Sequence, residues 1–309
     1  MNALYVVFIK IVVAVLLGFI LRKCKVINEE MQKGLSDMLV KAFLPFSILA
    51  SANYEKSPDL GRAMLAVLVG GLVFYAVALV SMRLLSKKLS ISDKEKRIFV
   101  TMTTFANTGF VGFPIMTALY GSEGLLLAVV YNMVYNLYMY TYGLHLISGK
   151  KGDLRGLLFQ PVNIASLLAI VFFISPITFP NYVTESVDLI AAVTVPLSMI
   201  IIGSNLAAMP FVTVLSDVKS YLVSLMRLLV LPGVCLGVVY VLYRTFSMAP
   251  TTASVIVLMG ALPCGSLNVI FSEKYDCAPE YAARATVQSM MLCAVTIPLM
   301  VFLCSKLFV

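Results

Sequence analysis

Long apolar runs separated by short polar stretches cover almost the whole chain. A helix needs roughly 20 apolar residues to cross the hydrocarbon core of a bilayer, which is about 30 Å thick. Ten runs approach or reach this length. The predicted transmembrane helices are 3–21, 35–53, 63–85, 98–120, 123–147, 160–178, 187–208, 219–243, 251–272 and 282–307. The loops between them are short, so no soluble domain is expected.

The composition agrees with this pattern. Of the 309 residues, 61% are hydrophobic and only 12% are charged, whereas a soluble domain is about half apolar and about a quarter charged. We therefore predict an all-α integral membrane protein. The net charge of +8 indicates cations that set orientation in a membrane rather than a surface for nucleic acid. Residues 1–9 carry no basic side chain, so the first run is expected to be a retained helix rather than a signal peptide.

Lys and Arg residues set the expected orientation, because cytoplasmic loops carry an excess of both. With the N-terminus outside, sixteen of the 23 Lys and Arg residues lie in inside loops. The four outside are Lys56, Arg62, Arg244 and Lys306. We therefore expect a multi-pass protein of the cell membrane with both termini outside.

The chain contains an internal repeat with an offset of 149–151 residues. Four matches support it: Asp37 with Asp188, the run 45–49 with 196–200, Pro114 with Pro263, and Ser122-Glu123 with Ser272-Glu273. Each half holds five predicted spans, an odd number, so the second half enters the membrane from the opposite side. The expected fold is ten transmembrane helices in two inverted five-helix repeats, residues 1–150 and 151–309. Asp37 and Asp188 stand near the starts of the second and seventh spans, where helix capping is expected.

Helix-breaking residues gather in two predicted spans. They are Gly109, Gly112 and Pro114 in the fourth span and Gly260, Pro263 and Gly265 in the ninth. Non-helical backbone inside a bilayer is tolerated only where it is buried or lines a cavity. Paired interrupted helices are typical of secondary transporters, whose substrate lies near the midplane. Crossing breaks would direct helix N-termini at one point and favour an anion. Simple kinks are the alternative, since Gly and Pro are common in membrane helices.

Three short motifs carry a resemblance to a known family. The motif Asn107-Thr108-Gly109-Phe110-Val111-Gly112-Phe113-Pro114 resembles the N-T-x-x-x-G-x-P crossover of the auxin efflux carrier family. That family includes the plant PIN-formed carriers and many bacterial transporters. The run 260–263 with 270–275 resembles the second crossover, and 160–163 resembles the start of the sixth span in plant members. The similarity covers essentially the whole chain, which lacks the long cytoplasmic loop of many plant members.

The resemblance implies the fold of bile-acid symporters and sodium/proton antiporters, with crossing broken helices 4 and 9. It implies a scaffold of spans 1, 2, 6 and 7 and a transport unit of spans 3–5 and 8–10, which moves by an elevator mechanism. It implies a small organic anion as substrate, such as malate, malonate or an auxin-like acid, in the inner membrane of a bacterium. Coupling to a proton or to sodium stays open, as does a homodimer packed through the scaffold. No cofactor is implied.

The predicted substrate-binding residues are Asn107, Thr108, Gly109, Gly112, Pro114, Asn132, Asn136, Asn163, Pro263, Cys264, Gly265 and Asn268. The resemblance gives Asn107 and Asn163 the leading role, since asparagines matching them hold the substrate carboxylate in plant members. Helix capping is the alternative for both. Asn132 and Asn136 lie four residues apart and therefore on one helix face. Packing between helices is an equal alternative for that face and for the neighbouring tyrosines.

Charged groups inside the predicted spans are few. Arg227 lies in the eighth span, where an acidic group, the substrate or backbone carbonyls could hold it. All fifteen Asp and Glu residues lie in loops or near span ends, which weakens a proton or sodium relay built on carboxylates. Sodium could still bind carbonyl groups of an unwound helix.

Other functions are weighed against a transporter of small anions. A channel also uses repeats and broken helices, but the chain shows no ring of pore-lining charge. A cation-coupled symporter for a larger amphipathic anion such as a bile acid stays open. An intramembrane enzyme is not expected, because the chain has one His, no H-E-x-x-H motif and no pair of mid-span aspartates.

Overall fold

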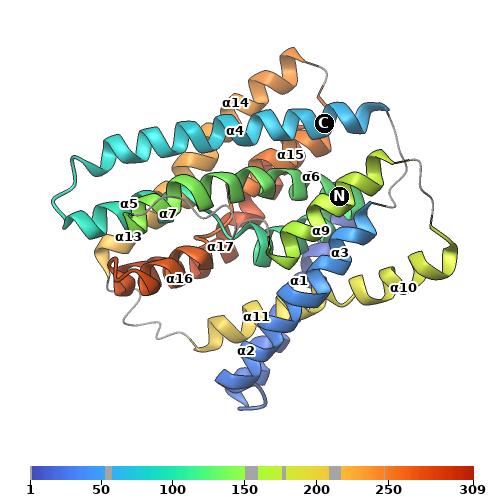
Figure 1. Ribbon diagram of the computed structural model, residues 1–309, viewed down its shortest axis with the longest axis horizontal. Coiled ribbons are helices and arrows are strands. Elements are labelled where there is room, and N and C mark those ends of the chain that lie inside the picture. The colour runs from blue at the N-terminus through green and yellow to red at the C-terminus, as the bar shows by residue number, and fades with distance from the viewer. Residues whose placement is uncertain (1, 53–57, 150–158, 176–178, 209–216, 247) are drawn as a thin grey trace. The chain divides into compact units, whose positions relative to one another are not determined.

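The computed structural model describes residues 2–52, 58–149, 159–175, 179–208, 217–246 and 248–309 (Figure 1). By their contacts the residues form two compact units. Unit 1 comprises Met1–Gly61, Gly109–Val130 and Leu158–Met209, and unit 2 comprises Arg62–Thr108, Tyr131–Leu157 and Pro210–Val309. Both units are built from helices.

Unit 1 contains a close pair of helices, α1 (Asn2–Lys23) and α11 (Thr194–Ala208), which lie side by side. Two glycines allow this approach. A Cβ atom placed on Gly18 would lie 2.0 Å from the carbonyl oxygen of Ile200, and one on Gly203 would lie 1.9 Å from that of Val15. Small residues at such a contact are the usual way in which membrane helices bring their backbones together.

A second group of unit 1 helices runs from α2 (Glu29–Met38) through η1 (Leu39–Phe43) into α3 (Leu44–Ser51). The label η marks a short π-helix here and below. Helix α3 packs on α9 (Pro161–Ile174) and α10 (Asn181–Ala191). Side chains join α2 to α11, because Gln32 donates to the side-chain oxygen of Asn205 and accepts from Ser204.

The expected capping role of Asp37 and Asp188 is wrong. Helix α2 begins earlier than predicted, and Asn28 caps it by accepting from the backbone of Met31 at 2.8 Å. Asp37 lies near the end of α2 and pairs with Lys41 at 2.6 Å, while Asp188 lies inside α10. The apolar runs begin one or two turns after the helices do, because the first turns of both helices are polar.

Helix α6 (Phe113–Tyr138) follows η2 (Thr108–Gly112) and continues through η3 (Met139–Gly143) into α7 (Leu144–Ser148). At Gly121 the backbone leaves helical geometry, with φ of +62° and ψ of −148°. This conformation favours glycine, which lacks the Cβ that would clash. The kink lies where the sequence separates the fourth and fifth spans.

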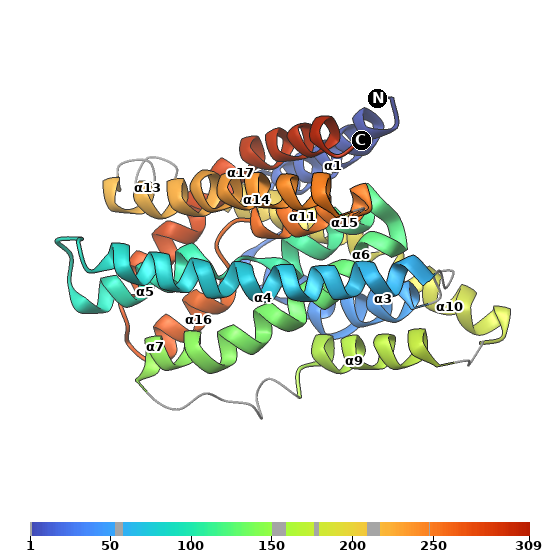
Figure 2. The same ribbon diagram turned by 90° about the horizontal axis from the view of Figure 1, so that it is seen from above.

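Two buried helices, α5 (Asp93–Thr104) and α15 (Pro250–Gly260), lie at the centre of unit 2. Besides these two, the end of α6, η3 and α7, its helices are α4 (Pro58–Ser86), which belongs to unit 2 from Arg62 onward, α13 (Val218–Leu225), η4 (Met226–Val230), α14 (Leu231–Thr245), α16 (Ser266–Lys274) and α17 (Pro279–Leu307). Helix α15 contacts α14 and α17, and α5 contacts α7, α16 and α17 (Figure 2). Every residue of 98–104 and 252–260 is buried, so α5 and α15 form the core of this unit.

Aromatic rings fill the space beside these two helices. Tyr75 of α4 is fully buried, and its ring centroid lies 5.9 Å from that of Phe105 and 5.6 Å from that of Tyr131. Tyr135 and Tyr138 lie 6.1 and 5.8 Å from Tyr75. Of the tyrosines beside Asn132 and Asn136, Tyr131 and Tyr135 are therefore packed in the core of unit 2, whereas Tyr138 and Tyr142 are half-buried.

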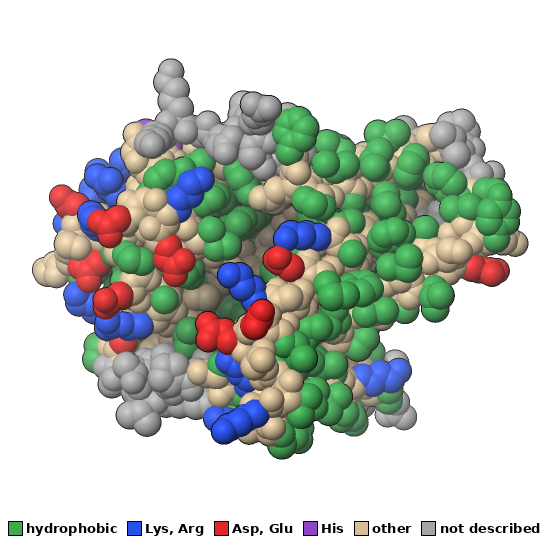
Figure 3. Space-filling view, turned by 60° about the horizontal axis from the view of Figure 1, so that its bottom comes forward, with side chains coloured by type: hydrophobic (Ala, Val, Ile, Leu, Met, Phe, Trp, Pro, Cys, Tyr) green, Lys and Arg blue, Asp and Glu red, His purple; other side chains and the backbone are tan. Residues whose placement is uncertain are grey.

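Apolar side chains also cover much of the face that Figure 3 shows. Helix α4 exposes an apolar face made of Leu65, Val69, Val73, Val77, Val80 and Leu84. Continuous apolar surface of this kind is unfavourable in water but suits contact with lipid. By length and composition, six helical stretches among the described residues can cross a membrane, and α9 and α15 are shorter apolar helices. The protein is therefore membrane-embedded, and ten spans in an inverted repeat stay a prediction.

Candidate functional site

The first helix break lies in unit 2 at residues 105–107. Helix α5 ends at Thr104, and Phe105 takes an extended conformation with φ of −98° and ψ of 110°. Helical structure resumes at Thr108. The break was expected around Gly109, Gly112 and Pro114, and this position is wrong. Those three residues lie in η2 and the first turn of α6.

The second break lies in the same unit between α15 and α16. Helix α15 ends at Gly260, and α16 begins at Ser266 after an extended Gly265 with φ of −75° and ψ of 136°. Pro263 lies within this break, whereas Pro114 lies inside a helix. The sequence match between the two prolines therefore does not correspond to equivalent positions in the structure.

The two breaks are hydrogen-bonded to each other. Ala106 and Cys264 form an isolated antiparallel bridge. The backbone N–H of Asn107 donates to Pro263 at 2.8 Å, and that of Gly265 donates to Phe105 at 2.9 Å. Backbone groups that leave a helix inside a membrane must find partners, and here each break supplies them to the other.

Gly265 is required by the closeness of this pairing. A Cβ atom on Gly265 would lie 2.7 Å from the carbonyl oxygen of Ala106. Asn268, one turn into α16, donates from its amide to the carbonyls of Phe105 at 3.1 Å and Gly265 at 3.0 Å. Its side-chain oxygen has no hydrogen-bond partner among the described residues. Asn268 therefore fastens one break to the other.

Polar side chains of other segments meet the breaks. The amide of Asn107 donates to the Ser266 hydroxyl at 3.2 Å. The hydroxyl of Thr108 donates to Asn132 at 2.6 Å, and both side chains are buried. In the second break, Cys264 donates its backbone N–H to the Ser289 hydroxyl at 3.1 Å. The structure thus brings together Asn107, Thr108, Asn132, Pro263, Cys264, Gly265 and Asn268 in unit 2.

The other predicted residues are placed as follows. Asn136 is buried one helical turn after Asn132, also in unit 2. Gly109, Gly112, Pro114 and Asn163 belong to unit 1, where Asn163 is buried in the first turn of α9. Sequence reasoning did not identify Ser266 and Ser289. The start of a half-helix directly after Gly265 could have indicated Ser266, but no local signal indicates Ser289.

Arg227 of η4 donates hydrogen bonds to backbone carbonyls at both breaks. It is fully buried and donates to the carbonyl oxygens of Leu262 at 2.8 Å, Gly260 at 2.6 Å, Thr104 at 2.9 Å and Thr103 at 3.2 Å. Of the alternatives that the sequence left open, backbone carbonyls are the observed partners. Among the described residues, Arg227 is the only buried Lys, Arg, Asp or Glu.

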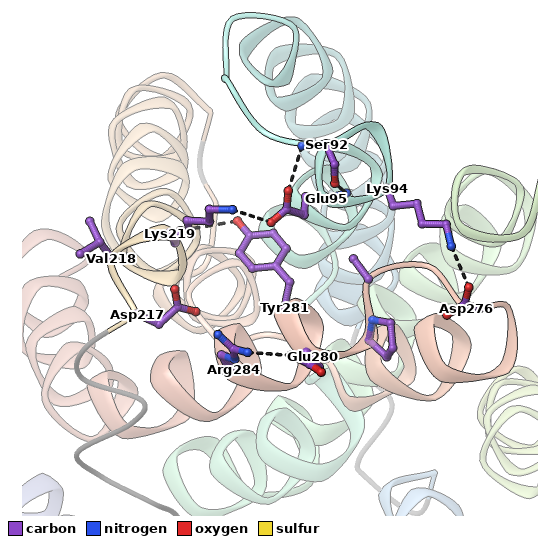
Figure 4. A pocket seen from close by; sticks show the side chains of 12 residues that line it. Ser92, Lys94, Glu95, Asp217, Val218, Lys219, Asp276, Glu280, Tyr281 and Arg284 are labelled. Atoms are coloured by element: carbon purple, nitrogen blue, oxygen red, sulfur yellow. Dashed lines mark hydrogen bonds and ion pairs between the residues drawn. The ribbon is translucent and has the colours of Figure 1, made fainter.

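A cavity of about 710 Å³, lined mainly by charged residues, lies by the first turns of α5, α13 and α17 (Figure 4). Three ion pairs line it: Lys219 with Glu95, Lys94 with Asp276, and Arg284 with Glu280, each at 2.7 Å. The Lys219 ammonium, together with the Ser92 N–H, lowers the pKa of Glu95 from 4.5 to about 2. In the described part of the chain, no three His, Cys, Asp or Glu residues are grouped to hold a metal ion.

Comparison with known proteins identifies the chain's relatives. A family model described as Membrane transport protein matches residues 3–156 and 150–301. An uncharacterized transporter of Methanothermobacter thermautotrophicus is 26% identical over 300 residues, which cover 94% of this chain and 95% of that protein. An uncharacterized transporter of Methanocaldococcus jannaschii is 22% identical over 276 residues, covering 86% of this chain and 87% of that protein. The chain belongs to the Membrane transport protein family, the family of the auxin efflux carriers.

Proposed function

We propose that the protein is a secondary transporter or facilitator of a small organic anion, most simply a carboxylate such as malate, malonate or an auxin-like acid. Membership in a family of membrane transport proteins supports transport. The electrostatics of the paired breaks support an anion. No other charged side chain among the described residues is buried, so no buried carboxylate balances the guanidinium of Arg227.

Helix ends add to this charge. The N-terminal end of a helix carries roughly half a positive charge and the C-terminal end roughly half a negative one. The C-terminal ends at Thr104 and Gly260 face Arg227. The helices that begin at Thr108 and Ser266 present N-terminal ends at the same breaks. The breaks as a whole are therefore electropositive and suit an anion better than a cation.

In the proposed mechanism, Asn107 donates its amide to a substrate carboxylate. Its present acceptor, Ser266, is a hydroxyl that can turn to donate as well. Both breaks belong to unit 2, so a substrate held there would travel with that unit. This supports alternating access by an elevator movement.

The test is ligand-dependent thermal stability of the purified full-length protein. A ligand that binds only the folded state raises the melting temperature. We expect at least one acid from a panel of mono- and dicarboxylates and indole-3-acetate to stabilise the wild type. Asn107→Ala should weaken this response, and Asn107→Asp should abolish it because its carboxylate repels the ligand. Asn181→Ala, at the exposed start of α10, is the control and should respond as the wild type does.

Transport in proteoliposomes completes the test. Uptake of the stabilising acid should saturate with concentration and fall at least tenfold in Asn107→Asp. Flux that rises linearly without saturation would indicate a channel. If no carboxylate stabilises or crosses the membrane with the wild-type protein, the organic-anion proposal is wrong.

A further inference from the structure

Arg227 donates hydrogen bonds to carbonyl groups at the ends of two helices. Its Nε donates to Leu262, its Nη2 to Gly260, and its Nη1 to both Thr104 and Thr103. Thr104 is the last residue of α5 and Gly260 is the last residue of α15. One side chain therefore contacts the C-terminal ends of both interrupted helices.

The carbonyl groups at these ends need a partner. The last four carbonyls of a helix have no partner within it, and two C-terminal ends together carry roughly one negative charge. In transporters with broken helices, half-helix C-terminal ends and unwound carbonyls are the groups that coordinate a coupling Na⁺. Here a guanidinium occupies them, and this group stays charged in proteins.

The surroundings of Arg227 leave little room for a second cation. The ring centroid of Phe74 lies 6.0 Å from the guanidinium carbon, and Arg227 has no exposed surface. A Na⁺ on the same oxygens would lie beside the guanidinium, and two like charges at such a distance in a medium of low polarity repel strongly. The four carbonyl groups thus have Arg227 as their hydrogen-bond donor, and its charge keeps Na⁺ away from them.

We propose that Arg227 is a resident cation that stands in the place of a coupling ion. It neutralises the two helix ends permanently, so the protein binds no Na⁺ at the paired breaks and moves its substrate without a sodium gradient. The statement about transport rests on the proposed function, whereas the statement about Na⁺ binding does not. Arg227 is a positioning residue, since it touches the backbone of the breaks rather than the proposed substrate.

Two measurements on the wild-type protein test the proposal directly. The melting temperature is compared in NaCl, KCl and choline chloride at equal ionic strength, without any substrate. We expect the three values to agree within about one degree. A rise of several degrees that is specific to Na⁺ would overturn the proposal. Uptake of the acid found above should likewise change less than twofold when choline replaces Na⁺, and a loss of uptake would overturn it.

Variants test whether the four carbonyls form a cation site. Arg227→Ala removes the guanidinium and should lower the melting temperature by several degrees. Millimolar guanidinium chloride, or NaCl in place of choline chloride, should restore part of this loss in Arg227→Ala and have no effect on the wild type. Arg244→Ala, which removes an exposed arginine near the end of α14, is the control and should show neither change.

The outcomes separate the two proposals. If Arg227→Ala folds but no cation restores its stability, the carbonyls are not a cation site and the inference fails. If Arg227→Ala does not fold, the Na⁺ comparison on the wild type still decides. If no acid binds the wild type but Na⁺ also has no effect, the organic-anion function fails while the resident-cation inference stands.

Discussion

The ammonium group of Lys219 donates to the carboxylate of Glu95 at 2.7 Å. This ion pair joins the first turn of α13 to the first turn of α5. Glu95 also accepts from the backbone of Ser92 at 2.8 Å, while the Ser92 hydroxyl accepts from the backbone of Glu95, which completes a capping box. The same carboxylate therefore fixes the start of α5 and its distance from α13.

This pair predicts a dependence of stability on pH. Because the pKa of Glu95 is lowered from 4.5 to about 2, its contribution is complete above about pH 4.5 and is lost as the pH falls towards 2. Solvent reaches the pair, so we expect about 1 kcal/mol from Glu95 at pH 6. Thermal unfolding of wild type and Glu95→Gln between pH 6 and pH 3 measures this. The two curves should converge as the pH falls.

The control for this prediction is Glu280→Gln. Glu280 is likewise in an ion pair, with Arg284 at 2.7 Å, but its side chain is 83% exposed. Its replacement should change the unfolding temperature little at either pH. Equal decreases of the unfolding temperature in the Glu95 and Glu280 variants would show that the ion pair with Lys219 stabilises the protein no more than an exposed ion pair does.

The pairing of the two breaks predicts that Gly265→Ala is strongly destabilising. The new Cβ would meet backbone atoms, which cannot move without opening the pair between Ala106 and Cys264. We expect a loss of about 1–3 kcal/mol, together with loss of transport. Gly237→Ala, on an exposed face of α14 with no atom within 4 Å of the new Cβ, should be neutral or slightly stabilising. A wild-type melting temperature for Gly265→Ala would contradict the close approach.

The contact between α1 and α11 predicts a similar result in unit 1. Gly203→Ala would place a methyl group against the backbone of Val15, so the helices must separate and lose contact along their length. We expect a loss of about 2 kcal/mol or more, measured by thermal unfolding in detergent. Gly34→Ala in α2, which meets nothing within 4 Å, is the matched control.

The hydrogen bond between Thr108 and Asn132 can be measured with a double-mutant cycle. Thr108→Val alone leaves the buried oxygen of Asn132 without its donor, and Asn132→Leu alone leaves the Thr108 hydroxyl without its acceptor. Each should cost about 1–3 kcal/mol, and the double variant should cost less than the sum. Strictly additive losses would mean that the two side chains do not interact.

The helices themselves follow largely from the sequence. The uninterrupted apolar runs at 63–85 and 282–307 correspond to α4 and α17. The division between the fourth and fifth spans also lies where Gly121 kinks the chain. In these segments periodicity and glycine geometry are local properties, which a sequence displays directly.

The candidate site could be predicted from the sequence only in part. Glycine and proline content indicated an interruption around Gly109, Gly112 and Pro114, but the helix ends earlier, at Thr104, before any breaking residue. Phe105 and Ala106 have no intrinsic reason to leave a helix. Their conformation depends on pairing with residues far along the chain, as do the contacts of Ser289 and Arg227. Such partners are set by tertiary structure, which local patterns do not contain.

The pairing of Phe105 and Asn107 with Gly265 and Pro263 also bears on how the protein is made. The ribosome delivers the first break long before the second, so in the nascent chain these backbone groups have no partner from the other half. Unpaired backbone in hydrocarbon costs several kcal/mol for each group. The backbone of residues 105–107 therefore reaches its final partners only after residues 263–265 have been synthesised, late in the production of the chain.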